Sequence, residues 1–399
     1  MAKVILKKGR EESVRRFHPW VFSGAIAQVV GNPAEGDVVG VYGADGAFLA
    51  SGHWQIGSIA VRILSFDSLV INEDYWKDMI FKAYQVRKAV GLVDEGSGNT
   101  NCYRLVHGEG DNLPGLIVDY YDGVCVMQAH SAGMFRAKKM ICDALLAVYG
   151  ETLKAVYDKS SGTAPFKAGL DLVDGYIFKR EDFNEDELVV LENGNKFIVN
   201  WTEGQKTGFF LDQRENRAKV GKYAKGRNVL NLFCYTGGFS IYALGAGARH
   251  VDSVDSSAKA MALVERNVRL GAFPEGSHEG FCEDAIDFLK KSPSGKYDLM
   301  IVDPPAFAKH RGALSNALRA YQRLNAAAIS KVAPRGLVFT FSCSQVVDTE
   351  SFSLAVFSAA AQAGRKVRIL DRLHQPADHS VNIYHPEGRY LKGLLLYVE

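Results

Sequence analysis

The stretch "NVLNLFCYTGGFSIYALGAGARHVDSVD", residues 228–255, predicts a buried strand, a glycine turn, a helix and a second strand. The alternation continues with strands at "YDLMIVD" and "GLVFTFS" and with helical spacing at 256–270, 284–291, 312–333 and 349–363. Such alternation is typical of a Rossmann-like, doubly wound and mainly parallel sheet. The chain ends in two strands without a helix between them, "VRILDRLH" and "GRYLKGLLLYVE", so we expect a last antiparallel strand added to the sheet edge.

The part of the chain before this sheet has a different pattern. Up to about residue 70 short strands alternate with turns such as Ala44-Asp45-Gly46, which indicates a small β-barrel-like module. A helix over 72–95, a strand pair around Asp122-Gly123 and a helix over 132–148 follow, which is typical of an α+β domain. A hairpin turn at Asn193-Gly194 comes next. The sequence therefore predicts a multidomain α/β protein with domains 1–70, 71–188 and 189–399.

The composition excludes several classes of protein. The 399 residues are 47% hydrophobic and 23% charged with a net charge of +2, as in a globular protein and unlike a disordered chain. There is no signal-peptide pattern and no run of about 18 apolar residues, so we expect a cytoplasmic protein that binds no membrane. The six cysteines form no C-x-x-C pair, from which we expect neither a metal site nor disulfides.

The turn after the first strand of the sheet is a candidate cofactor site. Adjacent Gly237 and Gly238 let the backbone approach a ligand closely, although this is not G-x-G-x-x-G. Asp255 ends the next strand, 22 residues after Phe233, where an acidic residue meets ribose hydroxyls in nucleotide-binding sheets. Together they favour an adenosine-containing cofactor. The alternative is that Asp255 only caps the following helix.

Two further strand ends carry candidate site residues. Asp284, after the third strand, either contacts an adenine amino group or caps a helix, and the sequence does not decide between them. The fourth strand ends in "IVDPPAF", where two prolines hold a rigid extended backbone. Asp303 stands at the base of this segment and Phe307 is placed to stack on a flat base.

Cys343 follows the fifth strand, between Ser342 and Ser344. It could be a core residue, a metal ligand or a nucleophile. No cysteine or histidine lies at ligand spacing, and the fifth strand should run beside the fourth, close to Asp303, so we favour the nucleophile.

The pattern "YTGGFS", Asp255, Asp284 and "DPPAF" resembles the class I S-adenosylmethionine-dependent methyltransferases. The stretch "QKTGFFLDQRENR", residues 205–217, is similar to one that helps enclose the cofactor in a set of RNA methyltransferases. The resemblance implies S-adenosyl-L-methionine as cofactor and transfer of a methyl group. A thiolate that adds to C6 of a pyrimidine makes C5 reactive enough to accept a methyl group, whereas methylation of an amine or of guanine N7 needs no thiol. The resemblance also implies a binding site made of Thr207, Phe209, Asp212, Arg214, Asn231, Phe233, Tyr235, Thr236, Gly237, Gly238, Asp255, Ser256, Asp284, Asp303 and Pro304.

The whole chain resembles the ribosomal large-subunit methyltransferase I family, which methylates C5 of a cytosine in 23S rRNA. "KKGREESVRRFHPWVFSGAI" (7–26) resembles its N-terminal PUA domain, an RNA-binding β-barrel, and "YRLVHGEGDNLPGLIVDYYDG" (103–123) resembles its middle domain. The catalytic motifs and "HQPADHSVNIYHPEGRYLKG" (374–393) occur in the family's order. The resemblance implies that Cys343 attacks C6 of a flipped cytosine and that Asp303 orients the base and supports protonation at N3.

RNA contacts are implied at both ends of the chain. Residues 1–16 carry six basic and two acidic side chains, which then become a phosphate-contacting patch. The implied substrate residues are Lys7, Arg10, Arg15, Arg16, Pro305, Phe307 and His379.

The base that removes the C5 proton stays open. Pro305 and Ala306 occupy the place where many RNA cytosine-5 methyltransferases carry a second cysteine. Water or His379 could serve, although a lone histidine in a loop is more often structural. The alternatives are methylation of uracil C5 or guanine N7, and a non-catalytic RNA-binding protein; a homodimer is also left open.

Overall fold

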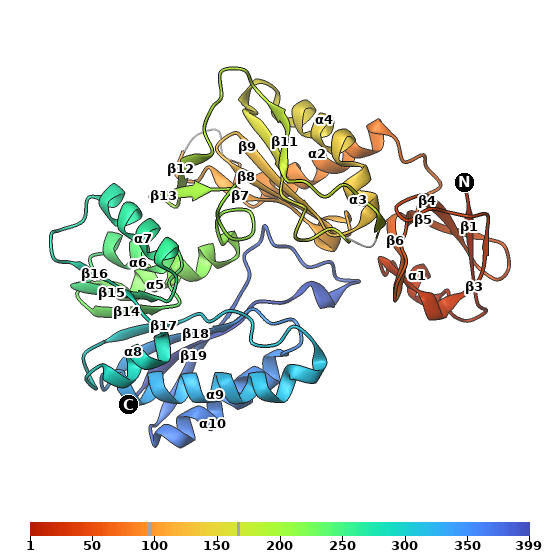
Figure 1. Cartoon of the computed structure of the whole chain (residues 1–399). Coiled ribbons are helices and arrows are strands. Elements are labelled where there is room, and N and C mark those ends of the chain that lie inside the picture. Colours follow the sequence, from red (N-terminus) through yellow and green to blue (C-terminus); the bar gives the residue numbers. More distant parts are fainter. Residues whose placement is uncertain (94–97, 166–167) are drawn as a thin grey trace. The chain divides into compact units, whose positions relative to one another are not determined.

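The computed structural model describes residues 1–93, 98–165 and 168–399 (Figure 1). The chain divides into two compact units, each made of segments that are distant in the sequence. The first unit contains Met1–Val190, Val199–Leu211 and Ala377–Gly388, and the second contains Leu191–Ile198, Asp212–Pro376 and Arg389–Glu399. Among the described residues, no helix has both the length and the apolar character needed to cross a membrane.

The first unit begins with a six-stranded sheet in the order β2-β6-β5-β4-β1-β3. All neighbours are antiparallel except β1 and β4, and Val4, Val39, Val41 and Val61 are fully buried in its core. This confirms the small β module expected before residue 70. Its elements are β1 (Lys3–Leu6), α1 (Glu12–Arg15), β2 (Trp20–Phe22), β3 (Ile26–Val30), β4 (Val38–Tyr42), β5 (Phe48–Trp54) and β6 (Ile59–Ser65).

An α+β region follows in the same unit, built on a five-stranded sheet in the order β11-β10-β9-β8-β7. Apolar side chains of α2 and α4, such as Trp76 and Leu145, are buried against the sheet. Asp122 and Gly123 have φ values of 44° and 93°, the positive values that a tight hairpin turn requires. The elements are α2 (Glu73–Ala89), β7 (Cys102–His107), β8 (Leu116–Tyr121), β9 (Val124–Ala129), α3 (Ala132–Arg136), α4 (Lys138–Tyr149), β10 (Ala155–Asp158) and β11 (Gly175–Lys179). The end of the helix predicted over 72–95 is wrong: α2 ends at Ala89, because Gly91 takes a positive φ of 76°. Residues 94 and 95 of that prediction lie outside the described residues.

A hairpin of β12 (Glu187–Glu192) and β13 (Asn195–Asn200) precedes the second large sheet. Its turn has positive φ at Asn193 (49°) and Gly194 (79°), as predicted from the Asn-Gly pair.

The second unit contains a seven-stranded sheet in the order β16-β15-β14-β17-β18-β20-β19. The strands from β14 to β18 are parallel, whereas β20 is antiparallel to both of its neighbours. The doubly wound sheet with a last antiparallel strand is therefore confirmed. The strands are β14 (Asn228–Leu232), β15 (His250–Asp255), β16 (His278–Cys282), β17 (Leu299–Val302), β18 (Gly336–Ser342), β19 (Val367–His374) and β20 (Lys392–Val398).

One expectation about this sheet is wrong: β20 lies between β18 and β19 and not at the edge. The physical reason is the burial of its side chains. Nearly all residues of β20 are buried, whereas most of β19 is exposed or half-buried. The apolar strand needs a hydrogen-bonded neighbour on each side, and the more polar β19 tolerates the edge.

Helices cover both faces of this sheet (Figure 1). Side chains of α8, α9 and α10 pack into one core, and those of α5 and α6 pack into another. The four helices predicted at 256–270, 284–291, 312–333 and 349–363 begin and end within about two residues of α7, α8, α9 and α10. The sequence analysis did not predict α5, because its buried face includes Arg214, Asn216 and Arg217 and so lacks apolar periodicity. The helices are α5 (Arg214–Ala224), α6 (Gly238–Gly245), α7 (Ala258–Gly271), α8 (Ala285–Lys291), α9 (Leu314–Lys331) and α10 (Thr349–Ala363).

Candidate active site

Asp303 directly follows the fully buried strand β17. The side-chain amide of Gln213 donates a hydrogen bond to Oδ2 of Asp303 at 3.0 Å. Burial, and then the neighbouring Asp212 carboxylate, raise the pKa of Asp303 to about 7. The carboxyl is therefore protonated part of the time at neutral pH and can both donate and accept a proton.

Cys343 lies one residue beyond β18, which pairs in parallel with β17. The register pairs Val302 with Thr340, so Asp303 and Cys343 leave the sheet at the same end. Burial raises the pKa of the half-buried Cys343 thiol to about 12, and the charges of Asp303 and Asp212 add to this increase. The structure thus brings the thiol and the acid together, and the resting thiol holds its proton.

Lys392 also belongs to this group, and the sequence analysis missed it. It pairs with Ser342 across β20 and β18, and its ammonium donates to the carbonyl oxygen of Ser344 at 2.6 Å. Burial lowers the pKa of Lys392 to about 8, while its positive charge lowers the pKa of Cys343. A lysine inside the apolar run "LKGLLLYV" was the signal that could have found it.

The two serines beside Cys343 fix the turn that carries it. The Ser342 hydroxyl donates to the Tyr321 hydroxyl at 2.9 Å, and the Ser344 hydroxyl donates to the carbonyl oxygen of Ala308 at 2.6 Å. The ring of Phe307 packs on Tyr321 with centroids 4.7 Å apart. The "DPPAF" segment and the thiol turn are therefore tied together, with Pro305 exposed beside them.

The turn after β14 is held by Asp255. One carboxylate oxygen of Asp255 accepts from the backbone N–H of Tyr235 at 3.0 Å, and the other accepts from that of Ser257 at 2.9 Å. The alternative in which Asp255 caps the next helix is wrong, because the Ser257 hydroxyl accepts from Ala260 and is the N-cap of α7. Gly237 has φ of 81°, and a Cβ there would lie 3.3 Å from Val264.

Buried polar side chains also hold the rest of the turn after β14 in place. The backbone carbonyl of Thr236 accepts from Asn267 at 2.8 Å, and the buried Arg217 packs against Gly238, where a Cβ would lie 3.0 Å from Arg217 Cδ. Arg217 in turn forms two hydrogen bonds with the buried Glu192, at 2.8 and 2.7 Å. In β14, Asn231 donates to the Ser240 hydroxyl at 2.8 Å. The backbone of the turn is thus preorganised for a ligand.

These groups fit S-adenosyl-L-methionine, which carries ribose hydroxyls, an ammonium group and a positively charged sulfur. Asp255 and Asp303 supply negative charge or acceptors at the ends of β15 and β17. Oδ2 of Asp212 accepts from the Tyr390 hydroxyl at 2.7 Å, whereas Oδ1 is buried with no hydrogen-bond partner among the described residues. An ammonium donor would satisfy this oxygen. Arg214 is buried nearby in sequence, 3.7 Å from Glu215.

Several predicted cofactor residues are less directly supported. Asp284 is the N-cap of α8 and accepts from the backbone N–H groups of Ile286 and Asp287, so its contact with adenine stays a prediction. Ser256 is exposed after β15, and Pro304 is buried after Asp303.

Thr207 and Phe209 belong to the first unit, unlike the other cofactor candidates. Thr207 is fully buried, and its hydroxyl donates to Asp119 at 2.5 Å and contacts the Tyr121 hydroxyl at 2.9 Å. Phe209 is buried as well. A contact of either residue with the cofactor stays a prediction.

The candidate RNA residues of the first unit differ in their surroundings. His379 is buried, its Nδ1 lies 3.1 Å from Asp378 and its ring lies 5.0 Å from that of His107, which favours a structural role. Around α1, the Lys7 ammonium donates to the carbonyl oxygen of Gly24 at 2.9 Å, and Arg15 lies 3.4 Å from Asp45. Arg10 and Arg16 are exposed.

Comparisons with known proteins agree with this organisation. Residues 4–66 match the family model of a PUA-like domain, and residues 181–383 match that of an S-adenosylmethionine-dependent methyltransferase. Ribosomal RNA large subunit methyltransferase I of Aeromonas hydrophila is 38% identical over 400 residues, covering 99% of both chains. The protein of the same name from Aeromonas salmonicida is 38% identical over 401 residues, covering 98% of both.

A solved structure shows the same fold. SMU.776, a candidate methyltransferase in complex with SAH, has a TM-score of 0.85 to this chain and 23% identity, with 100% of both chains covered. The chain therefore belongs to the ribosomal RNA large subunit methyltransferase I family and is a methyltransferase that uses S-adenosyl-L-methionine.

Proposed function

We propose that the protein methylates C5 of a cytosine in 23S rRNA in the cytoplasm, with Cys343 as the nucleophile. The observation that carries the proposal is the pair of Asp303 and Cys343 at the same end of adjacent parallel strands. The names of the relatives and the PUA-like domain support rRNA as the substrate. A methyl acceptor that lacks a nucleophilic atom explains why a thiol lies in the site.

The proposed addition step moves one proton and forms one bond. Bound S-adenosyl-L-methionine supplies an electrophilic methyl group. Sγ of Cys343 bonds to C6 of the cytosine while its proton passes through the Asp303 carboxyl to N3. The C5–C6 double bond shifts to C4–C5, and the C4–N3 double bond becomes a single bond as N3 takes the proton. C5 is then an enamine carbon that takes the methyl group. Both protonation states of Asp303 are available near pH 7, as this transfer requires.

The second half of the reaction releases the product. The C5 proton leaves, the C5–C6 double bond forms again, the sulfur departs from C6 as a thiolate, and N3 returns its proton to the Asp303 carboxyl. The departing sulfur is stabilised by the buried ammonium of Lys392 until it regains a proton. Pro305 and Ala306 carry no group that could accept the C5 proton, so we propose that water accepts it.

The raised pKa of Asp303 favours cytosine over uracil. N3 of neutral cytosine accepts a hydrogen bond, which a protonated carboxyl can donate, whereas N3 of uracil carries a hydrogen and would prefer a carboxylate. Guanine N7 is itself nucleophilic, so its methylation would require no covalent adduct with Cys343. A purely RNA-binding role would likewise leave the acid and thiol pair unused.

The decisive experiment compares Cys343→Ala with Cys142→Ala, a control at a free cysteine on α4 of the first unit. Each variant is incubated with methyl donor and protein-free 23S rRNA that lacks the modification, and modified bases are mapped. We expect 5-methylcytosine with the unaltered protein and with Cys142→Ala, and a rate at least about 10³-fold lower with Cys343→Ala. Normal methylation by Cys343→Ala would refute the nucleophile, and 5-methyluracil or 7-methylguanine would refute the base.

A trapping experiment tests the adduct directly. RNA with 5-fluorocytidine at the target position carries fluorine where the proton must leave, so elimination cannot follow methyl transfer. We expect a protein–RNA adduct that survives denaturation and disappears in Cys343→Ala.

A further inference from the structure

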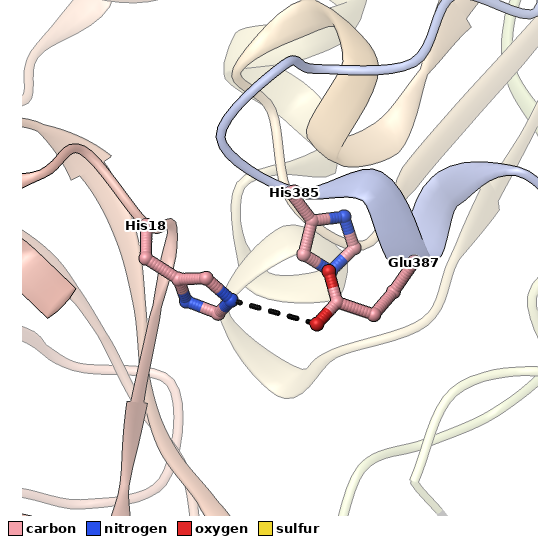
Figure 2. A group of neighbouring side chains, drawn as sticks. All are labelled: His18, His385 and Glu387. Carbon is pink, nitrogen blue, oxygen red and sulfur yellow. Dashed lines mark ion pairs between the residues drawn. The ribbon is translucent and has the colours of Figure 1, made fainter.

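Two histidines and a glutamate from the two ends of the sequence meet in the first unit (Figure 2). His18 precedes β2, whereas His385 and Glu387 belong to the segment Ala377–Gly388. Nε2 of His18 lies 3.9 Å from Oε1 of Glu387, and Nε2 of His385 lies 3.9 Å from Oε2 of Glu387. One ligand atom from each residue can be chosen so that all three lie within 4.8 Å of one another.

The surroundings of His385 point to a missing ligand. Its side chain is 4% exposed, and neither ring nitrogen has a hydrogen-bond partner among the described residues. Buried polar atoms in folded proteins nearly always have a partner. The Trp20 ring packs against the imidazole at a centroid distance of 4.3 Å and restricts its rotation. Figure 2 shows the His18 ring facing the Glu387 carboxylate, with the His385 ring beside that carboxylate.

Trp20 fixes the orientation of the His18 ring. Nδ1 of His18 accepts from the backbone N–H of Trp20 at 3.2 Å and also lies 3.3 Å from the Trp20 carbonyl oxygen. Nε2 is the nitrogen nearest Glu387. Metal binding at Nε2 requires the ring hydrogen to lie on Nδ1, where the Trp20 carbonyl oxygen can accept it, as in many metal-binding histidines.

We propose that His18, His385 and Glu387 bind a divalent transition metal ion of the zinc class, with water in the remaining position. Two imidazoles and one carboxylate are a ligand set that zinc uses. With metal–ligand bonds of about 2.0–2.1 Å, tetrahedral ligands lie roughly 3.3 Å apart, so each 3.9 Å pair must close by about 0.6 Å. The Glu387 side chain is 56% exposed and can move toward the two imidazoles. The histidine nitrogens, which lie within 4.8 Å of each other, must also approach.

The ion would tie the segment Ala377–Gly388 to the N-terminal domain. This segment connects β19 and β20 of the methyltransferase sheet, yet it belongs to the first unit. The expectation of no metal rested on cysteine spacing and could not detect ligands from opposite ends of the chain.

A second cluster provides an internal control. His250, Asp252 and Glu279 also lie within ligand distance of one another. However, Asp252 already accepts hydrogen bonds from the Lys296 ammonium at 2.6 Å and from the Tyr297 hydroxyl at 2.5 Å. The Lys296 ammonium already neutralises this carboxylate, so we expect no metal ion at the second cluster.

The test is zinc binding to the full, untagged chain after removal of metal with a chelator. Titration against a chromophoric zinc indicator should show one equivalent bound, and Co²⁺ should give the visible absorption of a tetrahedral site. We expect His18→Ala and Glu387→Gln to weaken binding at least tenfold and His250→Ala to leave it unchanged. Because the Glu387 side chain is exposed, Glu387→Gln should fold normally, and a loss of zinc binding in this variant cannot be attributed to misfolding.

Two results would overturn the proposal. One is the absence of stoichiometric zinc or cobalt binding to the unaltered chain. The other is binding that Glu387→Gln leaves unchanged, or that His250→Ala removes. Neither readout depends on methylation, so both are independent of the proposed reaction.

Discussion

Lys392 is the residue at which stability and activity oppose each other. A lysine buried in an apolar strand costs stability, and burial lowers its pKa to about 8 from about 10.5. Its ammonium is placed where it lowers the pKa of the Cys343 thiol. We infer that it positions charge for the reacting sulfur, since an apolar residue would fill the same space at lower cost.

The variant Lys392→Met should therefore slow methylation without weakening the fold. We expect a rate up to about tenfold lower at pH 7, because the ammonium is a minor influence among those that set the Cys343 pKa and a tenfold change in rate corresponds to about 1.4 kcal/mol. Lys392→Arg keeps the charge and should retain much more activity. The measurement is single-turnover methylation across pH together with thermal unfolding. Equal rates for the methionine and arginine variants would show that the charge has no role.

The lowered pKa of Lys392 also makes the stability of the folded chain depend on pH. The pKa of Lys392 is lower in the folded chain than in the unfolded chain, so between pH 8 and about 10.5 the unfolded state binds more protons. This residue therefore adds stability as the pH rises through that window. In Lys392→Met the increase should be absent.

At the scale of elements, α5 shows how polar contacts replace an apolar face. Its buried Arg217 forms a two-bond ion pair with Glu192 of β12 and packs against Gly238 in the cofactor turn. An isolated buried charge is far more costly than a buried pair. The ion pair thus places α5 correctly against the turn.

Removal of one member of this pair should be strongly destabilising. We expect Arg217→Met to lower the stability of the second unit by about 3–5 kcal/mol, because the buried Glu192 carboxylate loses its counter-ion and keeps only the Tyr242 hydroxyl as a donor. The double variant Arg217→Met/Glu192→Met should regain most of this loss. Hydrogen exchange of β14 amides provides the measurement, with the exposed Lys222→Met on the same helix as control. A single variant no worse than that control would contradict the argument.

The sequence predicted those elements whose patterns are local. The parallel strands, their helices and the Asn193-Gly194 turn follow from apolar spacing and turn chemistry. The position of β20 could not be read in the same way, because strand order depends on how much of β19 and β20 is buried. Helix α5 was not predicted because its buried face is largely polar, so its sequence lacks the apolar spacing that indicates a helix.

At the scale of the whole molecule, the site residues that were missed come together from distant segments. Cys343 and Asp303 could be paired from the sequence because adjacent parallel strands end together. Lys392 reaches Cys343 only through the antiparallel insertion of β20. His18 and His385 meet because the segment Ala377–Gly388 leaves the second unit. Contacts between such distant segments leave no characteristic spacing in the sequence, so sequence motifs could not predict them.

The N-terminal domain carries exposed arginines that lie outside the proposed reaction site. If the N-terminal domain holds rRNA through phosphates, the exposed Arg10 and Arg16 should contribute affinity but no chemistry. Arg10→Ala/Arg16→Ala should reduce the slope of log affinity against log salt by about 1.5, since each phosphate contact contributes roughly 0.7–0.9. Methylation at saturating RNA should not change.

The matched control is Arg319→Ala/Arg323→Ala, which removes two exposed arginines from α9. Filter binding to 23S rRNA fragments between 50 and 300 mM salt measures the slope for both double variants. An equal loss in both would mean that general charge, and not the N-terminal patch, attracts the RNA. A loss of rate at saturating RNA in the Arg10 and Arg16 variant would mean that these residues also position the target base. Only a reduced slope with an unchanged rate assigns them to the phosphates.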